Sequence, residues 1–255
     1  EELGYDDNFH DHHHGDKYQS NFITTYIFSQ DHKMIAKQFL ITGIFWAIIG
    51  GLMSLVFRLQ LGFPEENMAW LKPILGKWIT VTDAGVGSLS PEFYYALVTM
   101  HGTILVFFVL TAGLSGTFAN LLIPLQVGAR DMASPLLNML SYWFFFLAGV
   151  VMFFSLFLNT GPFAGGWTAY PPLSALPQAS SGSGAGMTLW LVALTLFVVS
   201  TLLGGINYIT TILNLRTKGM TMWRLPLTIW ALFVTAILGL LSFPVLVSGF
   251  LLLMF

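Results

Sequence analysis

The chain contains no cysteine and few charged side chains. Of its 255 residues, 9% are Asp, Glu, Lys or Arg, whereas 55% are hydrophobic. Without cysteine there is no disulfide framework, no thiolate metal site and no cysteine nucleophile, so any metal must be held by His, a carboxylate or a cofactor. The net charge of -2 and the lack of a Lys/Arg cluster give no electrostatic footprint for a nucleic-acid partner, and we exclude that class.

The charged residues are also unevenly distributed along the chain. Ten of them precede Phe39 and six lie at residues 63–92. This leaves five continuously apolar segments, each long enough to cross the roughly 30 Å hydrocarbon core of a bilayer as a helix. The segments lack the period-two alternation of barrel strands, so the sequence predicts an all-α, polytopic membrane helix bundle. The predicted helices span residues 39–62, 95–124, 136–158, 188–213 and 225–255.

Basic residues predict the orientation of these helices. Loops rich in Lys and Arg stay in the cytoplasm, and seven basic residues lie on the amino-terminal side against two on the other. We therefore expect the amino terminus inside, with residues 1–38 as a polar cytoplasmic segment. The seven are Lys17, Lys33, Lys37, Arg130, Arg216, Lys218 and Arg224, and the two are Lys72 and Lys77.

The two ends of the sequence suggest two further expectations. The fifth apolar segment runs to Phe255 without a polar flank and the chain begins with Glu1, so we expect it to be the amino-terminal part of a longer protein. Residues 10–16 hold four His and two Asp, which could bind a divalent metal. A solvated polar tail is the simpler interpretation, because no hydrophobic residues would support the ligands.

Two side chains within the predicted helices are candidates for binding a cofactor. Arg58 lies near the outer end of the first helix and His101 in the outer half of the second. A neutral imidazole in a bundle is costly without a partner, and it either hydrogen-bonds a neighbouring helix or ligates a metal or haem iron. Arg58 either snorkels to the interface or binds a polar group of a cofactor.

A second group of polar residues extends from the inner side toward the middle of the bilayer. It begins with a carboxylate in the short second loop and continues with amides and hydroxyls at helical spacing on three helices. Such residues either tighten helix packing or order a chain of waters, and the carboxylate at the mouth favours a proton path. The group comprises Asp131, Asn120, Asn138, Ser141, Ser200, Thr201 and Asn207.

Several spaced motifs carry a family resemblance. They are Met100-His101-Gly102-Thr103, Gly128-Ala129-Arg130-Asp131-Met132-Ala133, Trp167-Thr168-Ala169-Tyr170-Pro171-Pro172-Leu173, Leu203-Gly204-Gly205-Ile206-Asn207-Tyr208-Ile209-Thr210-Thr211 and Leu241-Ser242-Phe243-Pro244-Val245-Leu246. In this order they resemble subunit I of haem-copper oxidases, of the cytochrome c oxidase type. The likeness covers the chain from about His32 to Phe255.

The resemblance implies a haem site. His101 is similar to one axial ligand of the low-spin haem iron, and Arg58 and Trp167 are similar to the pair that hydrogen-bonds the formyl group of haem A. In this family the other haem ligands, the copper ligands and the cross-linked Tyr belong to later helices. We therefore expect a second haem and copper in the complete subunit. We expect no catalytic residue of the oxygen-reducing centre in this chain.

The resemblance also implies a D-type proton pathway. Asp131 is similar to its uptake carboxylate, Asn120 and Asn138 to its narrow part, and the four remaining polar residues to the lining of its water chain. Phe39 departs from the family pattern, because similar oxidases often carry a Tyr there whose hydroxyl supports the lower pathway.

The activity implied is that of a terminal respiratory oxidase. Such an enzyme reduces O2 to water with electrons from cytochrome c and pumps protons across an inner membrane, alongside subunits of the II and III types. Two alternatives stay open: a quinol oxidase shares these motifs, and a non-catalytic membrane scaffold or transporter would use His101 and Arg58 only for hydrogen bonds between helices.

Overall fold

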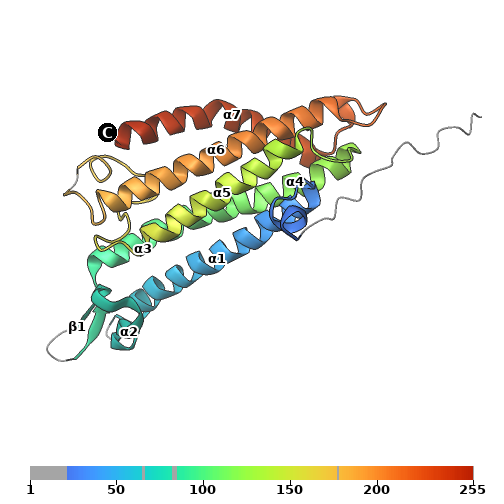
Figure 1. Ribbon diagram of the computed structural model, residues 1–255. Coiled ribbons are helices and arrows are strands. Elements are labelled where there is room, and N and C mark those ends of the chain that lie inside the picture. Colours follow the sequence, from blue (N-terminus) through green and yellow to red (C-terminus); the bar gives the residue numbers. More distant parts are fainter. Residues whose placement is uncertain (1–21, 65–66, 82–84, 177, 255) are drawn as a thin grey trace, which may run out of the picture.

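A computed structural model of the chain describes residues 22–64, 67–81, 85–176 and 178–254. In this part of the chain five helical spans are long and apolar enough to cross a membrane, which confirms the predicted helix bundle. The spans lie side by side (Figure 1). They are α1 (His32–Gly62), the continuous helix Pro91–Val127, α5 (Pro135–Ser155), α6 (Ala185–Asn214) and α7 (Leu227–Met254).

The second span changes its helix type along its length. It consists of α3 (Pro91–Thr103), a π-helical stretch η4 (Ile104–Leu114) and α4 (Ser115–Val127). Helices of the π type are rare and often occur at functional sites. Here the change begins within one turn of His101, the candidate ligand.

The first helix begins earlier than the sequence predicted. Its expected start was Phe39, but α1 begins at His32, so residues 32–38 are helical and do not belong to a separate polar segment. Hydropathy marks only the part of a helix in the hydrocarbon core, whereas backbone hydrogen bonds continue into the polar interface, where Lys33 and Lys37 stay exposed. The other helix ends agree with the prediction to within about one helical turn.

Local sequence signals set the ends of the helices around the second loop. Gly128 ends α4 with φ of 76°, a left-handed conformation that glycine adopts without strain. Ser134 then caps α5, because its Oγ accepts a hydrogen bond from the backbone N–H of Leu137 at 3.4 Å, and Pro135 occupies the first helical turn. The loop between the helices is therefore short and sharply bounded.

The connecting segments gather at two opposite ends of the bundle. At one end, the N–H and Oγ1 of Thr217 donate to the carbonyl of Val127 at 2.9 and 2.8 Å and tie the loop after α6 to the end of α4. At the other end, Lys77 Nζ donates to the carbonyl of Asn159. This arrangement agrees with the predicted alternation of the loops, while the side that faces the cytoplasm stays a prediction.

Shorter elements complete the described chain. The strands β1 (Ile79–Val81) and β2 (Gly87–Leu89) form an antiparallel hairpin between the first two spans, with Thr80 paired to Ser88. The remaining elements are η1 (Ile23–Ile27), η2 (Ala69–Leu71), α2 (Lys72–Leu75), η3 (Gly76–Trp78) and η5 (Met222–Arg224).

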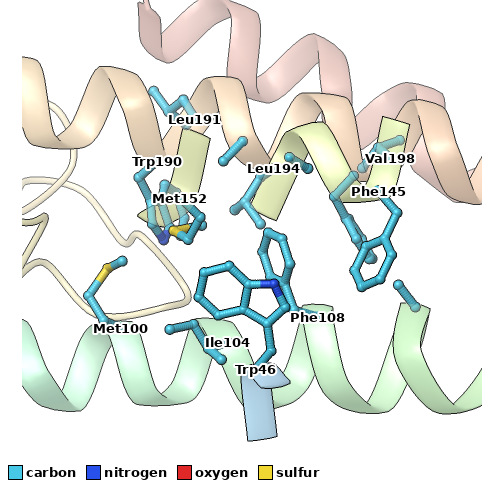
Figure 2. Close-up of a cluster of buried hydrophobic side chains, with 14 of the residues drawn as sticks. Trp46, Met100, Ile104, Phe108, Phe145, Met152, Trp190, Leu191, Leu194 and Val198 are labelled. Carbon is cyan, nitrogen blue, oxygen red and sulfur yellow. The ribbon is translucent and has the colours of Figure 1, made fainter. Parts of the chain in front are cut away.

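An aromatic core joins four of the five spans. The ring of Phe108 on η4 lies 5.3 Å from that of Trp46 on α1, 5.8 Å from that of Phe145 on α5 and 6.0 Å from that of Phe197 on α6, measured between centroids. Figure 2 shows Trp46, Phe108 and Phe145 in this cluster, together with Trp190 of α6. Because the four rings belong to four different spans, the cluster fixes the rotation of these helices relative to one another.

Two glycines allow α1 and η4 to approach closely. A Cβ atom added to Gly43 would lie 3.0 Å from the Cα of Gly113, and one added to Gly113 would lie 2.9 Å from the Cα of Gly43. Small residues at such crossings let helix backbones pack directly against each other. The contact lies between the two helices that carry Arg58 and His101.

Gly43→Leu should therefore destabilise the bundle. The new side chain meets backbone that cannot move aside, and overpacking of this kind costs about 1–3 kcal/mol. Gly51→Leu on the same helix is the matched control, because no atom lies within 4 Å of its added Cβ. Thermal unfolding of the complete purified oxidase should show a lower midpoint for the Gly43 variant alone, and equal midpoints would contradict this account.

Candidate functional site

His101 is held by a backbone carbonyl of the neighbouring helix. Its Nδ1 lies 2.8 Å from the carbonyl oxygen of Gly50 on α1. A carbonyl only accepts hydrogen bonds, so Nδ1 must carry the hydrogen, and in the neutral imidazole this leaves the lone pair on Nε2. A hydrogen bond of this kind fixes the tautomer and the ring orientation of a metal-ligating histidine.

The packing around His101 makes this bond possible. A Cβ atom added to Gly50 would lie 2.8 Å from Leu105 Cδ2, so the absence of a side chain brings the α1 backbone within reach of the imidazole. On the same helix, the ring of Phe57 meets the imidazole edge to face at a centroid distance of 5.5 Å. The ring of His101 is thus oriented by one polar and one aromatic contact.

Arg58 and Trp167, the other two predicted haem-binding residues, lie beside neighbours of His101. Arg58 follows Phe57, and its exposed side chain makes no hydrogen bond or ion pair among the described residues. Trp167 is 43% exposed and lies over Gly102, where an added Cβ would come within 2.9 Å of its Cδ1. Arg58 thus adjoins a residue that contacts His101, and Trp167 contacts the residue that follows His101, whereas contact of either side chain with a formyl group stays a prediction.

The described residues fit a haem in their donor set. They provide one imidazole with Nε2 available, a guanidinium that forms no ion pair with another described residue, and an indole beside a glycine. No group of three or more His, Asp or Glu that could hold a separate metal ion occurs among the residues the structure describes. The run of His and Asp at residues 10–16 lies outside that part of the chain.

Asp131 lies in a loop that two α6 side chains hold in place. Its Oδ1 accepts the N–H of Met132 at 2.7 Å. Asn207 receives the N–H of Ser134 at 2.8 Å and donates to the Ser134 carbonyl at 3.0 Å, and Thr211 Oγ1 accepts the N–H of Ala133 at 2.9 Å. Asn207 was predicted to line the water chain, but in the structure both of its amide atoms position the loop that carries the carboxylate.

The two predicted amides of the narrow part are fully buried and incompletely paired. Asn120 donates from Nδ2 to the carbonyl of Gly116 at 2.7 Å, but its Oδ1 has no partner among the described residues. In the same part of the chain neither side-chain atom of Asn138 has a partner. Buried polar atoms without a partner are costly, and they are commonly satisfied by ordered water. The two amides therefore have unpaired hydrogen-bond donors and acceptors with which a chain of waters can interact.

Three of the predicted hydroxyls meet at one cavity. Ser141, Ser200 and Thr201 line a cavity of about 270 Å³, to which residues of α1, η4, α4, α5, α6 and α7 contribute, Phe39 of α1 among them. Asp131, Asn120, Asn138 and Asn207 are not part of its lining. The structure therefore divides the predicted row into a lower group around the second loop and an upper group around the cavity.

One buried imidazole was missed by the sequence analysis. His101 was taken as the one histidine within the membrane helices, but His32 begins α1, is 3% exposed, and has its Nδ1 2.9 Å from the carbonyl oxygen of Asn120. Hydropathy excluded it because charged residues surround it. Asp31 immediately before it is a typical helix-start residue and was a signal that could have located this first turn.

Comparison with known proteins assigns the chain to a family. The profile of the family described as Cytochrome C and Quinol oxidase polypeptide I matches residues 34–255. The chain belongs to this family. It is 42% identical over 226 residues to an alternative cytochrome c oxidase subunit 1 of Bradyrhizobium diazoefficiens, covering 89% of this chain and 35% of the relative. The family that the motifs resemble is thereby confirmed.

Other relatives of the oxidase family give the same coverage. The chain is 37% identical over 230 residues to cytochrome c oxidase subunit 1 of Thermostichus vulcanus, across 90% of this chain and 37% of that protein. It is 36% identical over 238 residues to the subunit 1 of Bacillus subtilis, across 92% and 34%. The chain thus spans about a third of the length of the curated relatives it matches.

Proposed function

We propose that the chain is the amino-terminal part of the catalytic subunit of a terminal respiratory oxidase, which reduces O2 to water with electrons from cytochrome c and pumps protons. The observation that carries this proposal is the bond from His101 Nδ1 to the Gly50 carbonyl, which leaves Nε2 as a ligand atom.

The cofactor that this chain would bind is a low-spin haem A. His101 would hold the haem through a nitrogen ligand to the iron, and Arg58 and Trp167 would donate hydrogen bonds to the formyl group. When bound, the haem supplies a centre that gains and loses one electron. The cationic guanidinium of Arg58 would stabilise the added electron and hold the macrocycle in one orientation. A second haem and copper are expected from the rest of the subunit.

The proton path of this oxidase begins at Asp131. The carboxylate collects protons at the inner surface, and the amides of Asn120 and Asn138 orient single waters because an amide both donates and accepts. The chain of water then reaches the cavity with Ser141, Ser200 and Thr201. Asn207 supports the path by fixing the loop with Asp131.

The amino terminus lies inside, in the inner membrane, with subunits of the II and III types as partners. Six basic residues of the described chain lie at the end with Asp131, and Lys72 and Lys77 at the opposite end, which supports this orientation. Proton uptake would then occur from the cytoplasm. The six are Lys33, Lys37, Arg130, Arg216, Lys218 and Arg224.

Spectroscopy and turnover of the complete purified oxidase test this proposal. The reduced-minus-oxidised spectrum and the pyridine haemochrome should show haem A, and turnover should be faster with reduced cytochrome c than with a quinol. Faster turnover with quinol would assign the enzyme to the quinol oxidases, which the family also includes. A protein without haem bands would support the non-catalytic scaffold and overturn the proposal.

A further inference from the structure

The second span, α5 and α6 line the cavity with several Ser and Thr side chains. Each of these hydroxyls donates its hydrogen to a backbone carbonyl. Ser200 Oγ donates to the carbonyl of Ser141 at 2.6 Å, and Ser141 Oγ to that of Asn138 at 2.7 Å. Thr201 and Thr111 donate to carbonyls of their own helices at 2.9 and 2.8 Å, and Ser115 does the same. On this wall these hydroxyls face the cavity as acceptors only.

Tyr208 differs from these hydroxyls. It lines the same cavity, and its Oη accepts a hydrogen bond from Asn120 Nδ2 at 3.4 Å. No acceptor for its own hydrogen occurs among the described residues, so this hydrogen is available to the cavity. The phenol head lies over Gly204, where an added Cβ would come within 3.3 Å of Oη.

The hydroxyl of Tyr208 lies between the lower and the upper group of polar residues of the predicted proton pathway. Asn120 belongs to the lower group, whereas the cavity holds the upper group. Phe39 also lines the cavity but has no hydroxyl, and its ring packs against Gly116, where an added Cβ would lie 2.7 Å from its Cδ1. Ser141 also joins the two groups, but its hydrogen is donated to the Asn138 carbonyl, whereas Tyr208 contacts the Asn120 amide and lines the cavity with its own hydrogen free of any described acceptor.

We infer that Tyr208 is a positioning residue that connects the Asn120 amide to the cavity and aligns its water toward the acceptor hydroxyls. The inference rests on the proposed function, because it needs protons to move along this path. A proton that arrives from the Asn120 side is taken up on an Oη lone pair, while the phenol releases its own hydrogen to a cavity water. Because one proton is gained as the other leaves, no net charge remains on the phenol, and its hydroxyl then rotates so that its hydrogen faces the cavity again.

Tyr208→Phe in the complete oxidase tests this inference. The ring and its packing are kept and one hydroxyl is lost, so the rate of proton uptake should fall about fivefold, as expected when one hydrogen bond is removed from a transfer path. Tyr142→Phe is the matched control, because the Tyr142 hydroxyl pairs with Thr42 Oγ1 at 3.1 Å and does not line the cavity. Its proton uptake should stay unchanged, and haem content should be normal in both variants.

Rescue by Phe39→Tyr separates a lost hydroxyl from disturbed packing. In the Tyr208→Phe background it returns a phenol hydroxyl to the part of the same cavity that α1 lines, and most of the lost rate should be recovered. A double variant as slow as Tyr208→Phe would assign the loss to packing and overturn the inference. Full-rate proton uptake in Tyr208→Phe would overturn it as well.

The variant Asp131→Asn distinguishes this inference from the proposed function. If Asp131→Asn slows proton uptake and Tyr208→Phe does not, the pathway stands and the role of Tyr208 is wrong. If neither change slows uptake while haem A and oxygen reduction are normal, protons enter elsewhere, and the proposed pathway fails together with the inference.

Discussion

His101→Asn is expected to abolish the low-spin haem signal of the complete oxidase. The asparagine Nδ2 can still donate to the Gly50 carbonyl that His101 Nδ1 now reaches at 2.8 Å, so the contact between α1 and α3 is preserved. An amide nitrogen has no lone pair for iron, and the axial ligand is lost. Turnover should fall by more than about 100-fold, because losing even a hydrogen-bond partner of a metal ligand costs about 10- to 100-fold.

Optical spectra and haem content of the purified oxidase measure this effect. His32→Asn is the matched control, since the Nδ1 of His32 also meets a backbone carbonyl, that of Asn120 at 2.9 Å, but at the other end of the helices. Its low-spin haem band should be retained. A normal low-spin spectrum in the His101 variant would show that iron is bound elsewhere, and would remove the main support for the proposed function.

Asp131→Asn should separate proton uptake from haem binding. The asparagine Oδ1 can still accept the N–H of Met132 at 2.7 Å, and the contacts of Asn207 with Ser134 remain, so the loop keeps its conformation. The negative charge and the exchangeable proton are lost. Turnover coupled to proton uptake should fall by about 100-fold, the lower end of what a positioned proton donor or acceptor contributes.

Oxygen consumption and proton release by reconstituted vesicles measure this change. Glu92→Gln is the control, because it also neutralises one carboxylate, but an exposed one at the start of α3 and at the opposite end of the bundle. The haem spectrum should be normal in both variants, and turnover should be normal in Glu92→Gln. Undiminished turnover and pumping in Asp131→Asn would refute the role of this carboxylate.

The candidate residues were found from sequence with unequal success. His101 stood out because an imidazole in an apolar helix is unusual, and Asp131 because it is a carboxylate at a helix boundary. His32 was missed, since the first helix was started at Phe39. The structural role of Asn207 was also not foreseen, because the sequence shows an amide on a helix but not the loop to which it bonds.

The helix spans were determined by the sequence itself. Hydropathy over about 20 residues is a local property, and in a bilayer every backbone group must bond within its own helix, so composition decides which segments span. Ser134 with Pro135 and Gly128 set the helix ends in the same local way. The family motifs are likewise read directly from consecutive residues.

Only the tertiary structure decided which atoms remain free. Gly50 lies 51 residues from His101, Ser134 lies 73 residues from Asn207, and Asn120 lies 88 residues from Tyr208. These pairs depend on how the helices rotate and how closely they approach, which aromatic packing and the Gly43–Gly113 contact establish. These partners decide which nitrogen of a histidine, or which hydroxyl hydrogen, stays unpaired. Local sequence therefore cannot reveal that atom.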